Sequence, residues 1–225
     1  MKKSICIFFI LFSFFKVFAD ELNYKNISKI EMDVLRNDEV IGYSNYFFKH
    51  SGDIMIIENY TKFNVKMFGI KVFSINSKSK EIYQKNKLLS FESSTLQNDK
   101  KKFVKLIYDE NKNKFIINGS SYVGEANREN IIGNWWNAKI LETKTQISPL
   151  SGSIKKQEVN FINKDEIDYK GKKIKLFQYK LKSTENLPDD KKLDFDIWLK
   201  PNEGIIFKVK YNRLGSWEYR LKNYE

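Results

Sequence analysis

Short apolar runs alternate with polar turn residues along residues 39–104. The runs are rich in Ile, Val, Phe, Tyr and Thr, which suit the pleated surface of a sheet. Closely spaced runs of this kind, separated by turn residues, predict consecutive antiparallel strands. The rest of the chain is expected to build on this meander. The turn signals are Ser51-Gly52-Asp53, Gly69, Lys78-Ser79-Lys80, Lys85-Asn86-Lys87 and Asn98-Asp99.

The same pattern continues on both sides of this stretch and predicts an all-β fold, a meander of about 11 strands. Several runs are apolar on both faces, as Phe47-Phe48 and Ile56-Ile57 illustrate. Strands that are buried on both faces need a sheet that curls or is covered. A large curved antiparallel sheet or a partly open barrel is therefore expected. The strands are predicted at residues 27–35, 41–49, 54–65, 72–83, 88–96, 103–108, 115–118, 154–162, 174–181, 193–199, 205–211 and 217–221.

The strand pattern breaks between Ser120 and Gly152. Asn127 resembles a helix N-cap, so we expect one short helical excursion near residues 125–145 that packs on the sheet. Trp135 and Trp136 lie within it, and adjacent residues on a helix point about 100° apart. One indole is expected to seal the core while the other lines a groove. The alternative is that both fill the core.

Hairpin registers follow from turn chemistry and from the need to keep apolar side chains on one face. A two-residue Ser51-Gly52 loop would pair Phe48 with Met55. Near the C terminus, matching of apolar faces selects a five-residue loop at residues 200–204. The sequence therefore predicts a charged ladder that crosses three strands and consists of Asp194, Lys210 and Glu218.

Residues 1–19 are typical of a signal peptide. A basic Lys2-Lys3 pair precedes a short apolar run at residues 5–15, and Val17-Phe18-Ala19 offers a cleavage site. An uncleaved anchor is the alternative, although the apolar run is short for a membrane span. We therefore expect a secreted protein, in the bacterial periplasm, with a single β domain over residues 20–225. No stable membrane span is expected after cleavage.

Charge and cysteine content narrow the function further. The net charge is +12, and three lysines of residues 1–19 supply part of it, so residues 20–225 carry +9. The lysines are spread over turns and not gathered on one segment, so nucleic-acid binding is not expected. The only cysteine, Cys6, lies in the predicted signal peptide. Residues 20–225 therefore offer no disulfide, no thiolate nucleophile and no cysteine ligand.

No catalytic constellation emerges from the sequence. A nucleophile needs a base, and His50 is the single histidine and flanks a turn. Neither a G-x-S-x-G elbow nor a phosphate-binding glycine motif occurs. No catalytic residue, metal site or cofactor is expected. Paired carboxylates, which suffice for glycoside hydrolysis, remain a third hypothesis, and a solvated charged face explains them more simply. They are Glu92, Asp194, Asp196 and Glu218.

Several short strings, in order, resemble the domain of unknown function 6134 family, secreted proteins found mostly in proteobacteria. The chain departs from that pattern by lacking a glycine after Asn37-Asp38 and by doubling the tryptophan at Trp135. The family has no established activity, so the resemblance implies a curved antiparallel sheet and a secreted location. A broader resemblance to bacterial lipoprotein carriers concerns the fold alone. The strings are Ile41-Gly42, Ser51-Gly52-Asp53, Phe68-Gly69-Ile70, residues 88–98, Trp136-Asn137, Asp196-Ile197-Trp198 and residues 217–221.

Two-sided apolar strands and many Phe and Met residues favour a non-enzymatic protein that binds or shields an apolar, lipid-like ligand on a concave face. The alternative is a structural or interaction protein of the cell envelope with a filled core and an unidentified protein partner. A large apolar pocket would favour the first hypothesis and a filled interior the second. The residues expected to bind the ligand are Trp135, Trp136, Phe48, Met55, Phe63 and Met67.

Overall fold

The computed structural model describes residues 24–225, and the predicted signal peptide lies outside them. The predicted all-β fold is confirmed, with three single turns of 3-10 helix: η1 (Tyr24–Asn26), η2 (Ala138–Leu141) and η3 (Asp189–Lys191). Over the described residues, no helix has the length and apolar character needed to cross a bilayer. The strands are β1 (Lys29–Arg36), β2 (Glu39–Ser51), β3 (Ile54–Met67), β4 (Ile70–Gln84), β5 (Lys87–Gln97), β6 (Lys100–Asp109), β7 (Lys114–Gly119), β8 (Tyr122–Asn127), β9 (Ile131–Ile132), β10 (Thr145–Ile147), β11 (Ile154–Tyr169), β12 (Lys172–Ser183), β13 (Asp194–Lys200), β14 (Ile205–Asn212) and β15 (Ser216–Tyr224).

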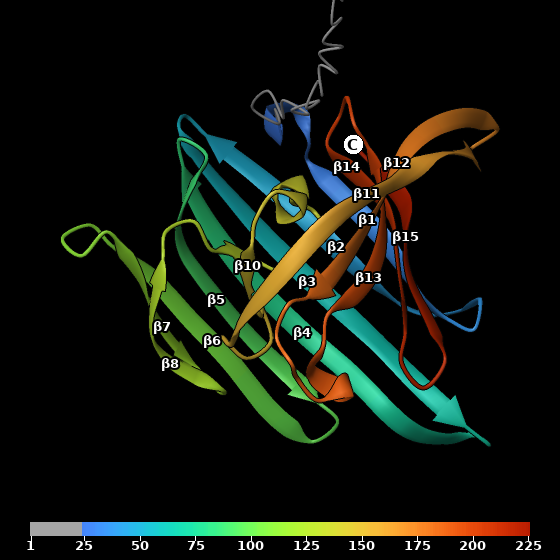
Figure 1. Cartoon of the computed structure of the whole chain (residues 1–225), viewed down its shortest axis with the longest axis horizontal. Coiled ribbons are helices and arrows are strands. Elements are labelled where there is room, and N and C mark those ends of the chain that lie inside the picture. The colour runs from blue at the N-terminus through green and yellow to red at the C-terminus, as the bar shows by residue number, and fades with distance from the viewer. Residues whose placement is uncertain (1–23) are drawn as a thin grey trace, which may run out of the picture.

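All fifteen described strands belong to one sheet, in the order β8-β7-β6-β5-β4-β3-β2-β1-β15-β14-β13-β12-β11-β10-β9. The chain starts in the middle of the sheet and builds outward from β1 to β8. It then crosses to the other edge and returns from β9 to β15, which pairs with β1. Neighbours are antiparallel except β9 and β10, which run parallel. The pairing of β1 with β15 therefore joins two meanders into one sheet (Figure 1).

The two edges of the sheet lie close together. β8 and β9 are consecutive in sequence, with residues 128–130 between them. The backbone N–H of Ser121, beside the β8 edge, donates a hydrogen bond of 3.0 Å to the carbonyl oxygen of Ser151. A Cβ atom at Gly119 would come within 2.5 Å of that same oxygen, so only glycine fits there. The sheet is therefore an open barrel whose edges approach through the loop before β11.

Residues 128–153 fill the inner side of the curved sheet, and Figure 1 shows β10 and η2 in front of strands of the larger meander. The segment is held against these strands, because Ser93 on β5 donates a hydrogen bond of 2.6 Å to the carbonyl oxygen of Pro149. The short helical excursion is η2. Asn137 caps it by accepting a hydrogen bond of 3.1 Å from the backbone N–H of Lys139. The expected cap, Asn127, instead ends β8.

One predicted turn is wrong, because β4 runs without a break through Lys78-Ser79-Lys80. The two lysines face solvent, and the small Ser79 points inward between Ser77 and the buried Glu81. Polar residues on both faces made this part of the strand resemble a loop. The turns at Lys85-Asn86 and Asn98-Asp99 lie where they were predicted.

The predicted register of the β2–β3 hairpin is wrong by two residues. Gly52 and Asp53 form the turn, so Phe48 faces Ile57 and not Met55. Of these two turn residues only Gly52 has a positive φ, 56°, which suits a turn with glycine at its first central position. A shift of two residues leaves every side chain on its expected face, which is why the hydrophobic pattern did not detect it.

The predicted register between β13 and β14 is also wrong. A four-residue loop, residues 201–204, closes the hairpin with Lys200 opposite Ile205. A bulge between Trp198 and Leu199 then restores the apolar match, so that Ile197 faces Val209. One extra residue in a strand changes the face of everything beyond it. The bulge thus performs the correction that the sequence pattern had assigned to a longer loop.

Gly119→Val should destabilise the fold by about 2 kcal/mol, because the nearest obstacle to its Cβ is backbone, which cannot rotate away. Urea unfolding followed by circular dichroism measures the change. Ser121→Ala, two residues away and exposed, is the control and should change stability little. Equal stability of the two variants would show that the edges of the sheet do not meet at Gly119.

Candidate functional site

A buried carboxylate lies inside the curved sheet on β4. The inward positions of this strand alternate along the chain as Ile75, Ser77, Ser79, Glu81 and Tyr83. Glu81 is 1% exposed, so its carboxylate is removed from water. A buried acid of this kind needs compensating hydrogen bonds. The residues that fill the sheet provide them.

Three neutral side chains donate hydrogen bonds to Glu81. The Trp136 indole Nε1 lies 2.9 Å from Oε1, and the Asn134 amide lies 2.5 Å from the same atom. The Tyr83 hydroxyl donates to Oε2 at 2.8 Å. Burial raises the pKa of Glu81 to about 7, although the three hydrogen bonds act in the opposite direction. Glu81 therefore titrates near neutral pH while it holds Trp136 and Asn134 in place.

Trp136 is the centre of an aromatic cluster. It is 2% exposed, and the rings of Tyr24, Phe48 and Tyr83 meet it edge to face with centroids 5.0, 5.6 and 5.6 Å away. Such arrangements are favourable beyond their buried area. The Tyr24 hydroxyl also accepts a hydrogen bond of 3.3 Å from the backbone N–H of Ala138. The inner segment, residues 128–153, is therefore held on both sides of Trp136, at Asn134 by Glu81 and at Ala138 by Tyr24.

Trp135 faces a different part of the molecule. It is half-buried and packs against Phe195 and Tyr219, with ring centroids 5.1 and 6.1 Å away. Its backbone N–H donates to the Tyr46 hydroxyl at 3.3 Å. One indole was expected to seal the core and the other to line a groove, but Trp136 is both buried and part of a pocket wall, while Trp135 does not line that pocket. The two indoles contact opposite meanders, so together they connect the two halves of the sheet.

A pocket of about 190 Å³ opens beside Trp136, at the end of the barrel where β4 turns into β5. Its apolar surface comes from Tyr24, Met55, Leu88, Phe115 and Trp136. A shallower pocket of about 330 Å³ adjoins it and shares Lys87 and Arg128 with it. The site is therefore an aromatic cavity that continues into a polar surface groove.

Cations dominate the rim of this pocket. Lys87, Arg128 and Lys139 line it, and no carboxylate does, although Glu110 lines the adjoining groove. Within the described part of the chain, none of these three cations forms an ion pair. Arg128 is held in place by Tyr108, whose ring centroid lies 4.1 Å from the guanidinium carbon and whose hydroxyl accepts a hydrogen bond of 2.5 Å.

A polar atom in the pocket wall lacks a protein partner. Asn130 lines the pocket and donates from its amide nitrogen to the carbonyl oxygen of Asn127 at 2.9 Å. Its side-chain oxygen is buried and accepts no hydrogen bond from the described residues. Buried polar atoms without a partner are rare and call for an explanation. Because this oxygen is buried, it lies behind the pocket surface and does not face the cavity.

Of the six residues expected to bind a ligand, two line this pocket and a third packs behind one of them. Met55 and Trp136 line it, and Phe48 supports Trp136 from behind. Trp135 faces away from it. Phe63 packs against Trp217 in a separate cluster, and Met67 is exposed at the far end of β3. The residues that were not predicted are Glu81, Asn134, Lys87 and Arg128, because no local signal distinguishes them from other polar strand and loop residues.

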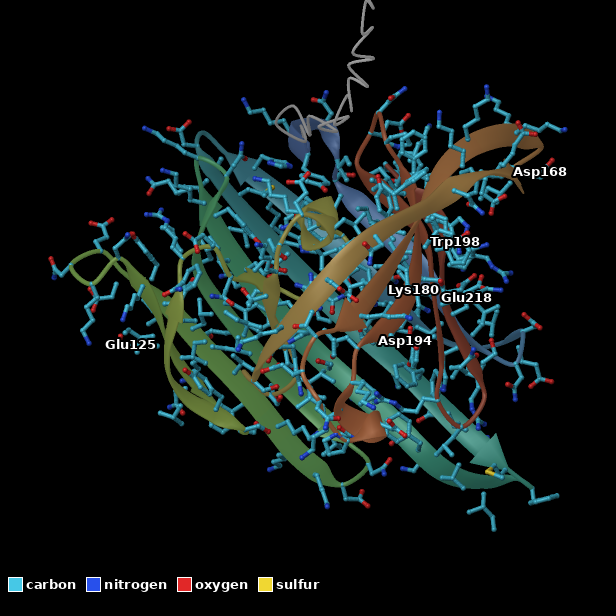
Figure 2. The ribbon with its side chains drawn as sticks, viewed as in Figure 1. Glu125, Asp168, Lys180, Asp194, Trp198 and Glu218 are labelled. Atoms are coloured by element: carbon cyan, nitrogen blue, oxygen red, sulfur yellow. The ribbon has the colours of Figure 1, made fainter. Side chains whose placement is uncertain are left out.

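The C-terminal carboxylates are neutralised by lysines. Lys180 on β12 contacts Asp194 at 2.6 Å and Asp196 at 3.0 Å, and Figure 2 shows Lys180 and Asp194 close together. Asp194 was predicted to face Lys210, but Asp196 occupies that register position. The predicted pairing of Glu218 with Lys210 is confirmed, at 3.0 Å.

Charge–charge contacts of this kind set register and do not resemble an acid–base pair around a cleft. Burial raises the pKa of Glu218, but hydrogen bonds from Arg220 and Lys210 outweigh it and hold that pKa below its ordinary value. Glu92, the fourth candidate, is exposed on β5. The four carboxylates therefore do not converge on one site.

Glu81 makes the stability of the protein depend on pH. In the unfolded chain its pKa is the ordinary 4.5, and in the fold it is about 7. Between these values the unfolded state loses the proton while the folded state keeps it, so the free energy of unfolding falls as pH rises. Below pH 4.5 both states are protonated and the effect is absent. We expect Glu81→Gln, which mimics the protonated acid, to gain about 3 kcal/mol relative to wild type between pH 4.5 and pH 8.

Urea titrations at several pH values measure that difference. Glu92→Gln, on the solvent face of β5, is the matched control and should follow the wild-type profile. Parallel profiles of wild type and Glu81→Gln over the whole range would contradict the role assigned to Glu81.

Comparisons with known proteins identify the family and the fold. A family model described as domain of unknown function (DUF6134) matches residues 32–222. A search of curated proteins finds no match. Among solved structures, the chain is similar to a β-barrel-like protein of domain of unknown function DUF1849 from Brucella abortus, with a TM-score of 0.61 and 10% identity over 88% of this chain and 97% of that one. At 10% identity this similarity shows the fold alone. Because the family model spans most of the sequence, the chain belongs to the DUF6134 family.

Proposed function

We propose that this protein binds a small anionic amphiphile in the pocket beside Trp136 and catalyses no reaction. The observation that carries the proposal is the composition of that pocket. Apolar and aromatic side chains form its inner surface, and three cations without carboxylate partners stand at its rim. Apolar cavities with a few polar groups at fixed positions are the usual form of small-molecule sites.

The size of the pocket limits what enters it. About 190 Å³ is below the range of roughly 300–1,000 Å³ that drug-sized ligands occupy. A single short alkyl chain or an aromatic ring fits such a space, whereas the two chains of a phospholipid do not. The anionic end of the ligand would lie in the adjoining groove, where Lys87 and Arg128 are available to it.

The filled interior argues against a carrier that encloses its cargo. Large side chains occupy the inside of the sheet, including the fully buried Phe91, Phe115 and Phe207. This observation favours the second candidate function, an interaction protein of the cell envelope, over a lipid-enclosing carrier. Binding of a small ligand at the barrel mouth is compatible with either role, since it needs no internal cavity.

We infer that the protein acts outside the cytoplasm, in the bacterial periplasm. The support is residues 1–19, whose basic start, apolar run and small residue before Asp20 follow the signal-peptide pattern. The absence of cysteine from residues 20–225 is neutral on this point, because a core of this size does not depend on disulfides.

Isothermal titration of residues 20–225 with decanoate, decyl maltoside and decyltrimethylammonium tests the proposal. The three probes share an alkyl chain and differ in charge. We expect decanoate to bind most tightly and the cationic probe most weakly. Leu88→Trp, which fills the pocket, should abolish binding of decanoate. Equal binding of all three probes, or no binding of any, would refute an anion-selective site.

The matching rim variant is Lys87→Gln combined with Arg128→Gln. It should weaken decanoate binding about tenfold and leave decyl maltoside unchanged, because only the charged head loses its partners. Leu96→Trp and Lys100→Gln, at the opposite end of the barrel, are the controls. Circular dichroism checks that each variant folds.

A further inference from the structure

The hairpin of β3 and β4 ends in an exposed apolar tip, residues 66–72. Phe68 is 99% exposed and Ile70 is 70% exposed, and about half of Met67 and Val72 is accessible. β2 pairs with β3 only as far as Phe63, and β5 pairs with β4 only from Ile75. The hairpin therefore extends beyond its neighbours as a two-stranded ribbon. Figure 1 shows its end projecting from the sheet.

The requirements of folding do not explain Phe68. It is the first residue of a two-residue turn and has a φ of 49°, a left-handed conformation that bulky side chains rarely adopt. The equivalent residues of the other two-residue turns with positive φ are Asn37, Gly52, Lys85, Asn98 and Lys170, and none of them is apolar and bulky. Asparagine or glycine at this position would relieve strain and remove an apolar ring from water. An exposed phenylalanine in this backbone conformation is therefore explained by contact with another molecule and not by a structural role.

The charge around the tip has one sign. From Asn59 to Lys80, both included, the sequence contains five lysines and no acidic residue. Lys66 and Lys71 lie opposite each other at the base of the tip, and both are exposed. The neighbouring turns carry both signs, with Asp38 before β2, Glu39 at its start, and Asp99 directly before Lys100-Lys101-Lys102, so a basic surface without acids is particular to this hairpin. A hydrophobic end with lysines behind it matches the order of layers in an anionic bilayer.

We propose that the β3–β4 tip inserts into the surface of a membrane that contains anionic phospholipid. Phe68, Met67 and Ile70 would enter the region between head groups and acyl chains. Lys66 and Lys71 would then lie at the level of the phosphates, where each lysine adds to the attraction. Because the tip belongs to the opposite end of the barrel from the pocket, this contact does not depend on the ligand site.

Vesicle flotation of residues 20–225 tests the proposal directly. Vesicles of phosphatidylglycerol and phosphatidylethanolamine provide the anionic surface, and phosphatidylcholine vesicles provide the neutral one. We expect binding to the anionic vesicles that weakens as salt is raised. Phe68→Asn should reduce the partition coefficient about tenfold, because the apolar ring is lost while the turn becomes easier to form.

Two further variants separate the contributions. Lys66→Gln with Lys71→Gln should reduce binding to anionic vesicles about tenfold and remove most of its salt dependence. Val123→Asn removes an exposed apolar side chain from β8, away from the tip, and is the control that should bind as wild type does. Wild-type binding by Phe68→Asn, or no vesicle binding by the wild-type protein, would overturn the proposal.

A label placed at the tip gives a second readout. Residues 20–225 contain no cysteine, so Met67→Cys carries a polarity-sensitive dye at one position while Phe68 is kept. Its emission should shift to the blue on anionic vesicles, and the emission of the same dye at Val123→Cys should not. The alternative is that the tip binds a protein, such as a second copy of this chain. Sedimentation of the protein without lipid tests this alternative. Self-association that Phe68→Asn abolishes, without vesicle binding, would identify a protein interface and refute membrane contact.

Discussion

The hydrogen bond between the Trp136 indole and the Glu81 carboxylate is the contact on which the interior of this barrel depends. A sheet of fifteen strands that curls toward closure has an inner face that must be covered. The chain covers it with residues 128–153, which contain little regular structure and so need fixed anchors. A buried indole requires an acceptor for its N–H, and Glu81 supplies one at 2.9 Å. The pocket lies between this filling segment, which contributes Trp136 and Asn137 to its wall, and the strand ends at Met55, Tyr83 and Leu88.

The Glu81 carboxylate that anchors Trp136 is energetically unfavourable where it lies. A buried carboxylate without a cation is unfavourable, which is why burial raises the pKa of Glu81 to about 7. A glutamine would accept the same two hydrogen bonds from Trp136 and Asn134 without that cost. The ionisable group therefore links the packing of the interior, and with it the wall of the pocket, to pH near neutrality. A change in the protonation of Glu81 affects its hydrogen bond with Trp136, and Trp136 belongs both to the segment that fills the sheet and to the pocket wall.

The parts of the fold that local signals determine were predictable. The turns at Lys85-Asn86 and Asn98-Asp99 follow from residues that tolerate the required backbone. The β13–β14 register failed because the bulge at Trp198/Leu199 has no sequence signal and shifts every residue beyond it. The β2–β3 register failed because the turn uses Gly52-Asp53 instead of Ser51-Gly52, a shift of two residues that leaves the apolar faces unchanged. The approach of the two edges at Gly119 joins residues from distant turns, which periodicity cannot detect.

The site was predicted only in part, for a similar reason. Aromatic residues in a β protein tend to be buried, so Trp136 and Phe48 were reasonable candidates, but burial alone does not distinguish a pocket wall from a core. Phe63 has the same pattern and lies in the core, against Trp217. Glu81 was missed because an acid at one inward position of a strand resembles an acid on its solvent face unless the register is known. Arg128 was missed because its position at the pocket depends on contacts with Tyr108, which lies twenty residues away in the sequence.

The two proposed sites lie at opposite ends of the same strand, which restricts how they can work together. β4 begins at Ile70 in the tip and ends at Gln84 beside the pocket, and its fifteen residues span about 45 Å. A membrane held by the tip would therefore lie far from the pocket, beyond the reach of a ligand that stays in the bilayer. A ligand of the pocket must then arrive through water, which agrees with a small, charged amphiphile and not with a phospholipid taken from that membrane. The strand acts as a spacer, and the pocket would be presented to the aqueous side.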